Sequence, residues 1–329
     1  MTKSIAPPVV AAFLLAAIAG HVSAQRSSSR LLVLNKEDAT MVVVDPESGS
    51  VLGKVGVGQG PHELVVSTDG KTAFASNYGV GRQGPGHTIS MIDIAAMKEL
   101  RRIDVSPLMQ PHGLAYAGGK LYFTAEGSRK IARYDPAADK VDWEFETGQN
   151  VTHMVMVSKD LKTIFTSNIG SNGVSIIRQG SGGGWTQTLV AVGNGPEGID
   201  LAPDGREIWS AHSQDGGLSI IDVASAKVVH TIDAGTKRSN RVKLTTDGRF
   251  ALVSDLDAGE LVVVDAAKHV VVKRLPLGKQ PEGVLIAPDG RAFVAVNGDN
   301  QIAVVDTKTW TVTKRLSPGT GPDGMAWVQ

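Results

Sequence analysis

The sequence contains no cysteine, few aromatic residues and no net charge, and each shortage excludes a class of protein. Without cysteine there are no disulfides, no thiolate metal ligands and no cysteine nucleophile. The 33 basic and 33 acidic residues of this 329-residue chain cancel, so no global field attracts polyanions and nucleic acid is not an expected partner. Aromatic side chains make up only 5% of the chain, which leaves few platforms on which single-stranded bases would stack.

The N-terminus carries the one long apolar run of the sequence. Lys3 precedes an apolar stretch at residues 8–18, and the small residues Val22-Ser23-Ala24 follow it. This order is typical of a secretory signal peptide, so we expect residues 1–24 to be cleaved and residues 25–30 to form a short linker. A single membrane anchor is the alternative, although the run is shorter than the ~20 residues of a span. The sequence therefore predicts a periplasmic or secreted protein with no membrane span after cleavage.

One segment recurs along the rest of the chain. It begins at Gly60-Pro61-His62, passes through an Asp69-Gly70 turn and ends at Asn77. A period near 40 residues with short alternating strands and glycine-rich turns is typical of a four-stranded propeller blade. The residue after the proline, or its equivalent, is called the anchor here. Seven anchors occur at spacings of 41 to 50 residues: His62, His112, His153, Glu197, Asn240, Glu282 and Asp323.

The two ends of the chain complement each other. After the N-terminal segment, residues 31–35, 39–45 and 51–57 read as the second, third and fourth strands of a blade that has no first strand. Residues 324–328 supply a first strand with nothing after it. A blade shared between the termini closes the ring and covers both sheet edges. We therefore predict an all-β fold, a single seven-bladed β-propeller over residues 31–329.

Two stretches resemble known families. The phrases Pro281-Glu282-Gly283-Val284 and Ala287-Pro288-Asp289-Gly290, with Ile302 to Asp306, are similar to the YVTN repeat of surface-layer-type and exported propellers. That resemblance covers residues 31–329 and implies the fold more than the function, because propellers host many activities. The stretch Pro61-His62 with Ala75 to Gly79 is similar to a motif of the seven-bladed lactonase family, and this local resemblance implies an enzyme with basic and acidic catalytic residues.

Each anchor is expected at one mouth of the central channel, beside the residue that closes the first hairpin of its blade. The innermost strand begins at that face and the second strand returns to it, so residues 15 apart, or 14 in the second copy, meet there. For the Asn and Asp members of the closing set, a role as turn formers is the simpler interpretation. All fourteen residues are polar or ionisable: His62 with Asn77, His112 with Glu126, His153 with Asn168, Glu197 with His212, Asn240 with Asp255, Glu282 with Asn297 and Asp323 with Asn35.

Histidines occupy the anchors of three consecutive blades. His62, His112 and His153 come in succession, and the next blade offers Glu197 and His212. Imidazole nitrogens with a carboxylate are typical ligands of Zn, Cu, Fe or Mn. We therefore predict one divalent transition metal held by these residues, with Glu126 as a supporting carboxylate. Two alternatives stay open: the histidines hydrogen-bond water or backbone without a metal, or they contact a polar or anionic ligand directly and act as acid or base.

The opposite arc of anchors is acidic. Glu197, Glu282 and Asp323, with Asn240 between them, form an oxygen-rich set that suits Ca or Mg. This set resembles, in residue chemistry, the propeller lactonases of the senescence-marker type, which bind a divalent cation through Glu, Asn and Asp. Asp255 is a further candidate for ligand binding, and so is Arg82 in the inserted loop at residues 79–87.

Two classes of function follow from these residues. The first is an exported binding protein that holds a small ligand, a metal or a protein partner at the channel mouth. The second is a metal-dependent lactonase or lyase, in which the histidine-bound metal is the Lewis acid and Glu197 or Glu282 is the catalytic base. The oligomeric state and the identity of the substrate are not encoded in any recognisable pattern.

Overall fold

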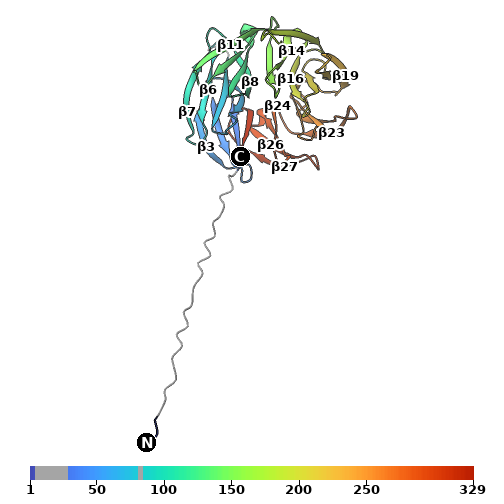
Figure 1. Cartoon of the computed structure of the whole chain (residues 1–329). Helices are drawn as coiled ribbons and strands as arrows, with labels where there is room; N and C mark the ends of the chain where they lie inside the picture. Colours follow the sequence, from blue (N-terminus) through green and yellow to red (C-terminus); the bar gives the residue numbers. More distant parts are fainter. Residues whose placement is uncertain (4–28, 81–83) are drawn as a thin grey trace.

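Seven four-stranded antiparallel sheets surround a central axis in the part of the chain that the structure describes (Figure 1). The structure is a computed structural model that describes residues 1–3, 29–80 and 84–329. Nearly all of the predicted signal peptide, most of the predicted linker and Arg82 lie outside these residues. Among the described residues, no helix is both long and apolar enough to cross a membrane.

The blades are numbered here in chain order, and each is written from its innermost strand to its outermost strand. Blade 1 is β4 (Pro61–Val66), β5 (Thr72–Gly79), β6 (Pro85–Asp93) and β7 (Lys98–Asp104). Blade 2 is β8 (Pro111–Ala117), β9 (Lys120–Ala125), β10 (Lys130–Asp135) and β11 (Lys140–Glu146). Blade 3 is β12 (Thr152–Val157), β13 (Thr163–Asn168), β14 (Gly173–Gln179) and β15 (Trp185–Ala191). Blade 4 is β16 (Pro196–Leu201), β17 (Glu207–His212), β18 (Gly217–Asp222) and β19 (Lys227–Asp233).

The remaining blades complete the ring. Blade 5 is β20 (Ser239–Leu244), β21 (Phe250–Asp255), β22 (Glu260–Asp265) and β23 (Val270–Pro276). Blade 6 is β24 (Pro281–Ile286), β25 (Ala292–Val296), β26 (Gln301–Asp306) and β27 (Thr311–Leu316). Blade 7 is β28 (Pro322–Val328), β1 (Arg30–Asn35), β2 (Thr40–Val44) and β3 (Val51–Gly56). Three short 3₁₀ turns follow second strands: η2 (Glu126–Ser128), η3 (Ile169–Ser171) and η4 (Asn297–Asp299).

The shared blade confirms the predicted closure. The C-terminal strand β28 pairs antiparallel with β1, and Leu31 lies opposite Trp327. Figure 1 shows the blue N-terminal strands beside the red C-terminal strands. Blade 7 also packs closely on blade 1, because a Cβ on Gly324 would lie only 2.2 Å from the carbonyl oxygen of His62. A glycine after the anchor is therefore required where neighbouring inner strands approach this closely.

Local sequence explains the strands and their turns. The middle strands are largely buried and rich in apolar residues, as in β2 (sequence TMVVV), whereas outer strands such as β27 are mostly exposed. At the first hairpin of blade 1, the Asp69 carboxylate accepts hydrogen bonds from Ser67 Oγ (2.6 Å) and the Lys71 amide (3.1 Å), and Gly70 has a φ of +71°. Asp favours such a turn because its carboxylate accepts the local hydrogen bonds, and Gly favours it because it adopts a positive φ without strain. The core lies between adjacent blades, where apolar side chains of both sheets pack together.

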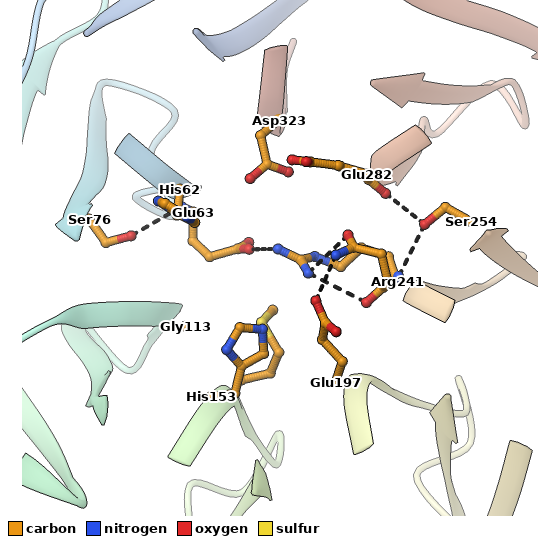
Figure 2. A network of polar contacts seen from close by, with 12 residues as sticks. His62, Glu63, Ser76, Gly113, His153, Glu197, Arg241, Ser254, Glu282 and Asp323 are labelled. Atoms are coloured by element: carbon orange, nitrogen blue, oxygen red, sulfur yellow. Dashed lines mark hydrogen bonds and ion pairs between the residues drawn. The ribbon is translucent and has the colours of Figure 1, made fainter. Parts of the chain in front are cut away.

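Hydroxyl groups fix the anchors of neighbouring blades relative to one another. Thr124 Oγ1 of β9 donates to the carbonyl of His153 (2.6 Å), and Ser167 Oγ of β13 donates to the carbonyl of Glu197 (2.8 Å). Ser254 Oγ of β21 does the same to Glu282 (2.7 Å; Figure 2). Because these bonds are buried and link one blade to the next, they set the positions from which the anchor side chains project.

Candidate functional site

A cavity of about 620 Å³ opens at the channel mouth where the innermost strands begin. Each anchor is the second residue of its innermost strand, and Figure 2 shows anchor side chains from several blades converging on the centre. The predicted anchors line the cavity together: His62, His112, His153, Glu197, Asn240, Glu282 and Asp323. The structure thus brings all seven anchors to one site.

A second ring of lining residues comes from the ends of the second strands. Each of these residues directly follows the last residue that pairs with the innermost strand. In blade 1 the ladder ends with Pro61 opposite Asn77, and the next residue, Tyr78, lines the cavity. The same offset places Lys36 of blade 7 and Glu126 of blade 2 in the cavity wall, and it also brings in Ile169, Ser213 and Leu256. Successive side chains of a strand point to opposite faces, so this one-residue step decides which side chain reaches the cavity.

The rings of the three anchor histidines lie side by side and are tilted against one another. The ring centroids of His112 and His153 are 3.9 Å apart, and those of His62 and His112 are 5.0 Å apart. His112 and His153 are buried, at 3% and 7% exposure. His62 Nδ1 donates to the carbonyl of Gly60 (2.7 Å), which leaves its Nε2 with a free lone pair because a carbonyl can only accept.

Glu126 joins the His153 ring to a tyrosine. One ligand atom each of His112, Glu126 and His153 lie within 4.8 Å of one another. Oε1 of Glu126 contacts Nδ1 of His153, and Oε2 accepts a hydrogen bond from the Tyr78 hydroxyl (2.6 Å). His62 is not a member of this close group, although it neighbours His112. The group has the ligand types and the proximity of a transition-metal site.

A lysine lies among the carboxylates of the acidic arc. Lys36 Nζ is 2.6 Å from Glu282 Oε2 and 2.8 Å from Asp323 Oδ2. The tethered ammonium therefore occupies the region where a Ca or Mg ion at this arc would sit. Farther round, Asn240 Nδ2 donates to Glu197 Oε1 (2.7 Å). Both of the predicted catalytic bases, Glu197 and Glu282, thus accept hydrogen bonds from neighbours.

Arg241 crosses the channel below the anchors. It follows the anchor of blade 5, and its guanidinium forms an ion pair with Glu63, the residue after the anchor of blade 1 (Figure 2). A second guanidinium nitrogen donates to Asn240 Oδ1 (3.2 Å). The side chains of Arg241 and Glu63 are only 8% and 15% exposed. Arg241 lines the cavity, and its ion pair with Glu63 links blade 5 to blade 1 across the channel.

The environment shifts several pKa values. Burial, together with the positive charge of Lys36, lowers the pKa of His62 to about 4, and burial with the two flanking histidines lowers the pKa of His112 well below its ordinary value. Burial and the neighbouring Asp323 raise the pKa of Glu282 to about 7. Burial opposes the charge of Lys36, but Asp323 and Glu282 outweigh it and raise the pKa of Lys36. His62 and His112 are therefore neutral at pH 7.

The residues that close the hairpins do not reach the cavity in most blades, which corrects the expected pairing. Asn77 donates to Thr88 Oγ1 and Ser90 Oγ between the second and third strands, and Asp255 accepts from the amides of Lys237 and Arg238. His212 contacts Asp215 (3.0 Å) and does not line the cavity, so it does not join the histidine cluster. In blades 1, 4 and 5 the second lining residue lies 16 residues after the anchor, as Tyr78 does after His62, so the expected spacing of 15 was wrong by one residue.

Several lining residues were missed by the sequence analysis. Tyr78 and Ile169 lie 16 residues after their anchors, and Lys36 follows Asn35, so a shift of one residue from the predicted closing positions would have found all three. Arg241 and Glu63 both follow an anchor directly. Their pairing across the channel joins blades 5 and 1, and no local sequence pattern indicates it.

The comparisons with known proteins agree with this architecture. The chain belongs to the YNCE-like beta-propeller family, whose model matches residues 118–289, just over half of the chain. Among relatives, antigen Lp49 of Leptospira interrogans is 27% identical over 152 residues, which cover 40% of this chain and 33% of Lp49. Protein NirF of Pseudomonas aeruginosa is 31% identical over 129 residues, covering 36% of this chain and 32% of NirF. The chain therefore matches about a third of the length of these relatives.

A solved structure shows the same fold over nearly the whole chain. The periplasmic gluconolactonase PpgL of Pseudomonas aeruginosa superposes with a TM-score of 0.74 at 21% identity. The superposition covers 92% of this chain and 99% of PpgL. At this level of identity the likeness shows the propeller fold, and the function has to be argued from the cavity itself.

Proposed function

We propose that this chain is an exported binding propeller that holds one divalent transition-metal ion, of the Zn, Cu, Fe or Mn group, at its channel mouth. The ligands are His112, Glu126 and His153. The observation that carries the proposal is the proximity of one ligand atom from each residue, all within 4.8 Å of one another. Such a group needs only small side-chain movements to reach metal–ligand distances of about 2.0–2.2 Å.

Two ring nitrogens of this group support the proposal. Among the described residues, His112 Nδ1 and His153 Nε2 are buried and have no hydrogen-bond partner. A buried polar atom without a partner costs about 1–3 kcal/mol, and a metal ion would supply the missing partner. The lowered pKa of His112 keeps its imidazole neutral, which is the form that binds metal.

The formal charges around the cavity favour a cation. Four carboxylates line the cavity and a fifth, Glu63, pairs with the lining residue Arg241, against three lining cations, so the excess is two formal negative charges. Partial protonation of Glu282, whose pKa is raised to about 7, reduces this excess. A divalent ion would neutralise the remaining negative charge. The carboxylates are Glu63, Glu126, Glu197, Glu282 and Asp323, and the cations are Lys36, Arg238 and Arg241.

Three protein ligands leave at least one coordination position open toward the cavity. A small molecule could enter there and bind the metal directly. The lactonase or lyase alternative needs a free base beside that position, and its candidates Glu197 and Glu282 are engaged by Asn240 and Lys36. Binding is therefore the function that the site supports best.

Calorimetric titration with Zn²⁺ tests the proposal on metal-free protein purified after export. We expect one tight site, lost in a variant that combines His112→Ala and His153→Ala. His230→Ala is the matched control, because His230 is an exposed histidine of β19 outside the cavity. Equal Zn²⁺ affinity in the double variant and the wild-type protein would contradict the proposal.

Export is the second part of the proposal. The charged start, the apolar run and the small residues before Gln25 support it. Fractionation of cells expressing the full chain tests it directly. We expect the protein outside the cytoplasm with Gln25 as its first residue, whereas an uncleaved protein in the membrane fraction would contradict the expectation.

A further inference from the structure

Val151, at the rim of the cavity, has an unusual backbone conformation. Its φ is +53°, in the left-handed region that favours glycine. The equivalent residues before the first strands of blades 1, 4 and 7 are Gly60, Gly195 and Gly321, with φ of +59° to +67°. A β-branched residue is a rare occupant of this region because its side chain crowds the backbone. Blades 2 and 6 have the unbranched residues Gln110 and Gln280 at this position, so Val151 is the β-branched residue among these left-handed positions and carries the greater conformational cost.

The side chain of Val151 makes little contribution to the core. It is 38% exposed and lines the cavity, and it is not part of any of the apolar clusters between blades. Ile169, at the start of η3 in the same blade, lines the cavity beside it. Blade 3, which also supplies His153, thus presents two apolar side chains to the cavity. Exposed apolar side chains inside a cavity are characteristic of ligand contact.

The side chain of a positively charged residue lies on the other side of the cavity mouth. Arg238 of blade 5 is exposed and lines the cavity. No ion pair involves its guanidinium within the described ranges of the chain, whereas Lys36 and Arg241 are both paired with carboxylates. Blade 4 separates the apolar wall from Arg238 and contributes Ser213 and Gln214. One ligand could therefore touch both.

We infer that the cavity binds an amphiphilic organic anion, whose apolar part lies on Val151 and Ile169 and whose acidic group faces Arg238. The volume of about 620 Å³ lies within the range of small-molecule sites and far exceeds that of a hydrated ion. The inference rests on the proposed function in one respect, since the ligand shares the cavity with the metal and faces its open position.

Fluorescence titration with 8-anilino-1-naphthalenesulfonate, an apolar anion, tests the inference with and without Zn²⁺. Val151→Gly should weaken probe binding about three- to five-fold, because a partly exposed valine contributes about a third of the effect of full burial. Its melting temperature should stay equal or rise, because the left-handed strain is removed. Gln280→Gly is the matched control: Gln280 has a φ of +52° at the equivalent position of blade 6 and does not line the cavity.

Arg238→Gln should weaken the probe about two- to five-fold at low salt, and the difference should shrink at high salt. Lys237→Gln, the exposed neighbour outside the cavity wall, should not. Unchanged probe affinity in Val151→Gly, an equal loss in Gln280→Gly, or a lower melting temperature of Val151→Gly would each overturn the inference. If the probe responds as expected but no Zn²⁺ binds, only the metal proposal is contradicted. If Zn²⁺ binds but Val151→Gly does not change probe affinity, only this inference is contradicted.

Discussion

Replacing Arg241 by methionine should lower the free energy of unfolding by about 3–5 kcal/mol, which is the typical cost of removing one partner of a buried ion pair. Arg241 and Glu63 are nearly enclosed, and they join blades 5 and 1 across the channel. Methionine keeps much of the side-chain volume but leaves the Glu63 carboxylate near the axis without its cation. The acidic arc then loses one of its two paired positive charges, which increases the repulsion among the remaining carboxylates.

Urea denaturation of a double-mutant cycle measures this effect. Glu63→Gln alone should cost about 1–3 kcal/mol, because the amide oxygen still accepts from Arg241. The variant with both changes should be more stable than the sum of the single effects predicts, by about 1–3 kcal/mol. Arg102→Met is the control, because Arg102 pairs with Glu99 on the surface at 43% exposure, and exposed pairs contribute about 0–1 kcal/mol. A cost below about 1 kcal/mol for Arg241→Met, with no coupling to Glu63, would refute the reasoning.

Three further predictions concern the site and the ring. Burial and Asp323 raise the pKa of Glu282 from 4.5 to about 7, so the folded protein binds the proton of this carboxyl group more tightly than the unfolded chain does. The contribution of Glu282 to the free energy of unfolding is therefore complete below pH 4.5 and is lost as the pH rises to 7. The stability difference between wild type and Glu282→Gln should therefore fall by about 3 kcal/mol across that window in pH-dependent denaturation, and a flat difference would disprove the shift. Tyr78→Phe should weaken Zn²⁺ binding about ten-fold in competition with a chelator, because Glu126 loses the donor that orients it, and unchanged affinity would show that the hydroxyl has no such role. Deletion of residues 322–329 removes β28 and exposes the edge of β1, so it should cause aggregation at temperatures where the full chain is monodisperse by light scattering, and a stable soluble product would contradict ring closure by this strand.

The sequence predicted the architecture because a propeller repeats one simple unit. The anchors, the Asp-Gly turns and the incomplete blade at each end determine the number of blades and their closure. Each of these features is local, and each recurs with the same hydrophobic alternation. Consistency between local preference and global fold makes such a prediction reliable.

The cavity was predictable only in part. The anchors converge as expected, since each occupies the same position in its blade. The closing residues were misplaced, because strand side chains alternate and one residue of error in the register turns a side chain to the opposite face. Glu126 reached the cavity because the ladder of blade 2 is shorter, with Pro111 opposite Ala125. The contacts of Lys36 with Glu282 and of Arg241 with Glu63 join residues 246 and 178 positions apart, and a single sequence carries no signal for them.

Elemental analysis of the exported protein, purified without chelator or affinity metal, tests the proposed metal site most directly. We expect close to one Zn, Cu, Fe or Mn per chain in the wild-type protein, and a loss of that metal in the variant that combines His112→Ala, Glu126→Ala and His153→Ala. The His230→Ala protein should keep its metal. A wild-type protein that contains no transition metal, and whose melting temperature is unchanged when Zn²⁺ is added, would contradict the assignment of His112, Glu126 and His153 as metal ligands.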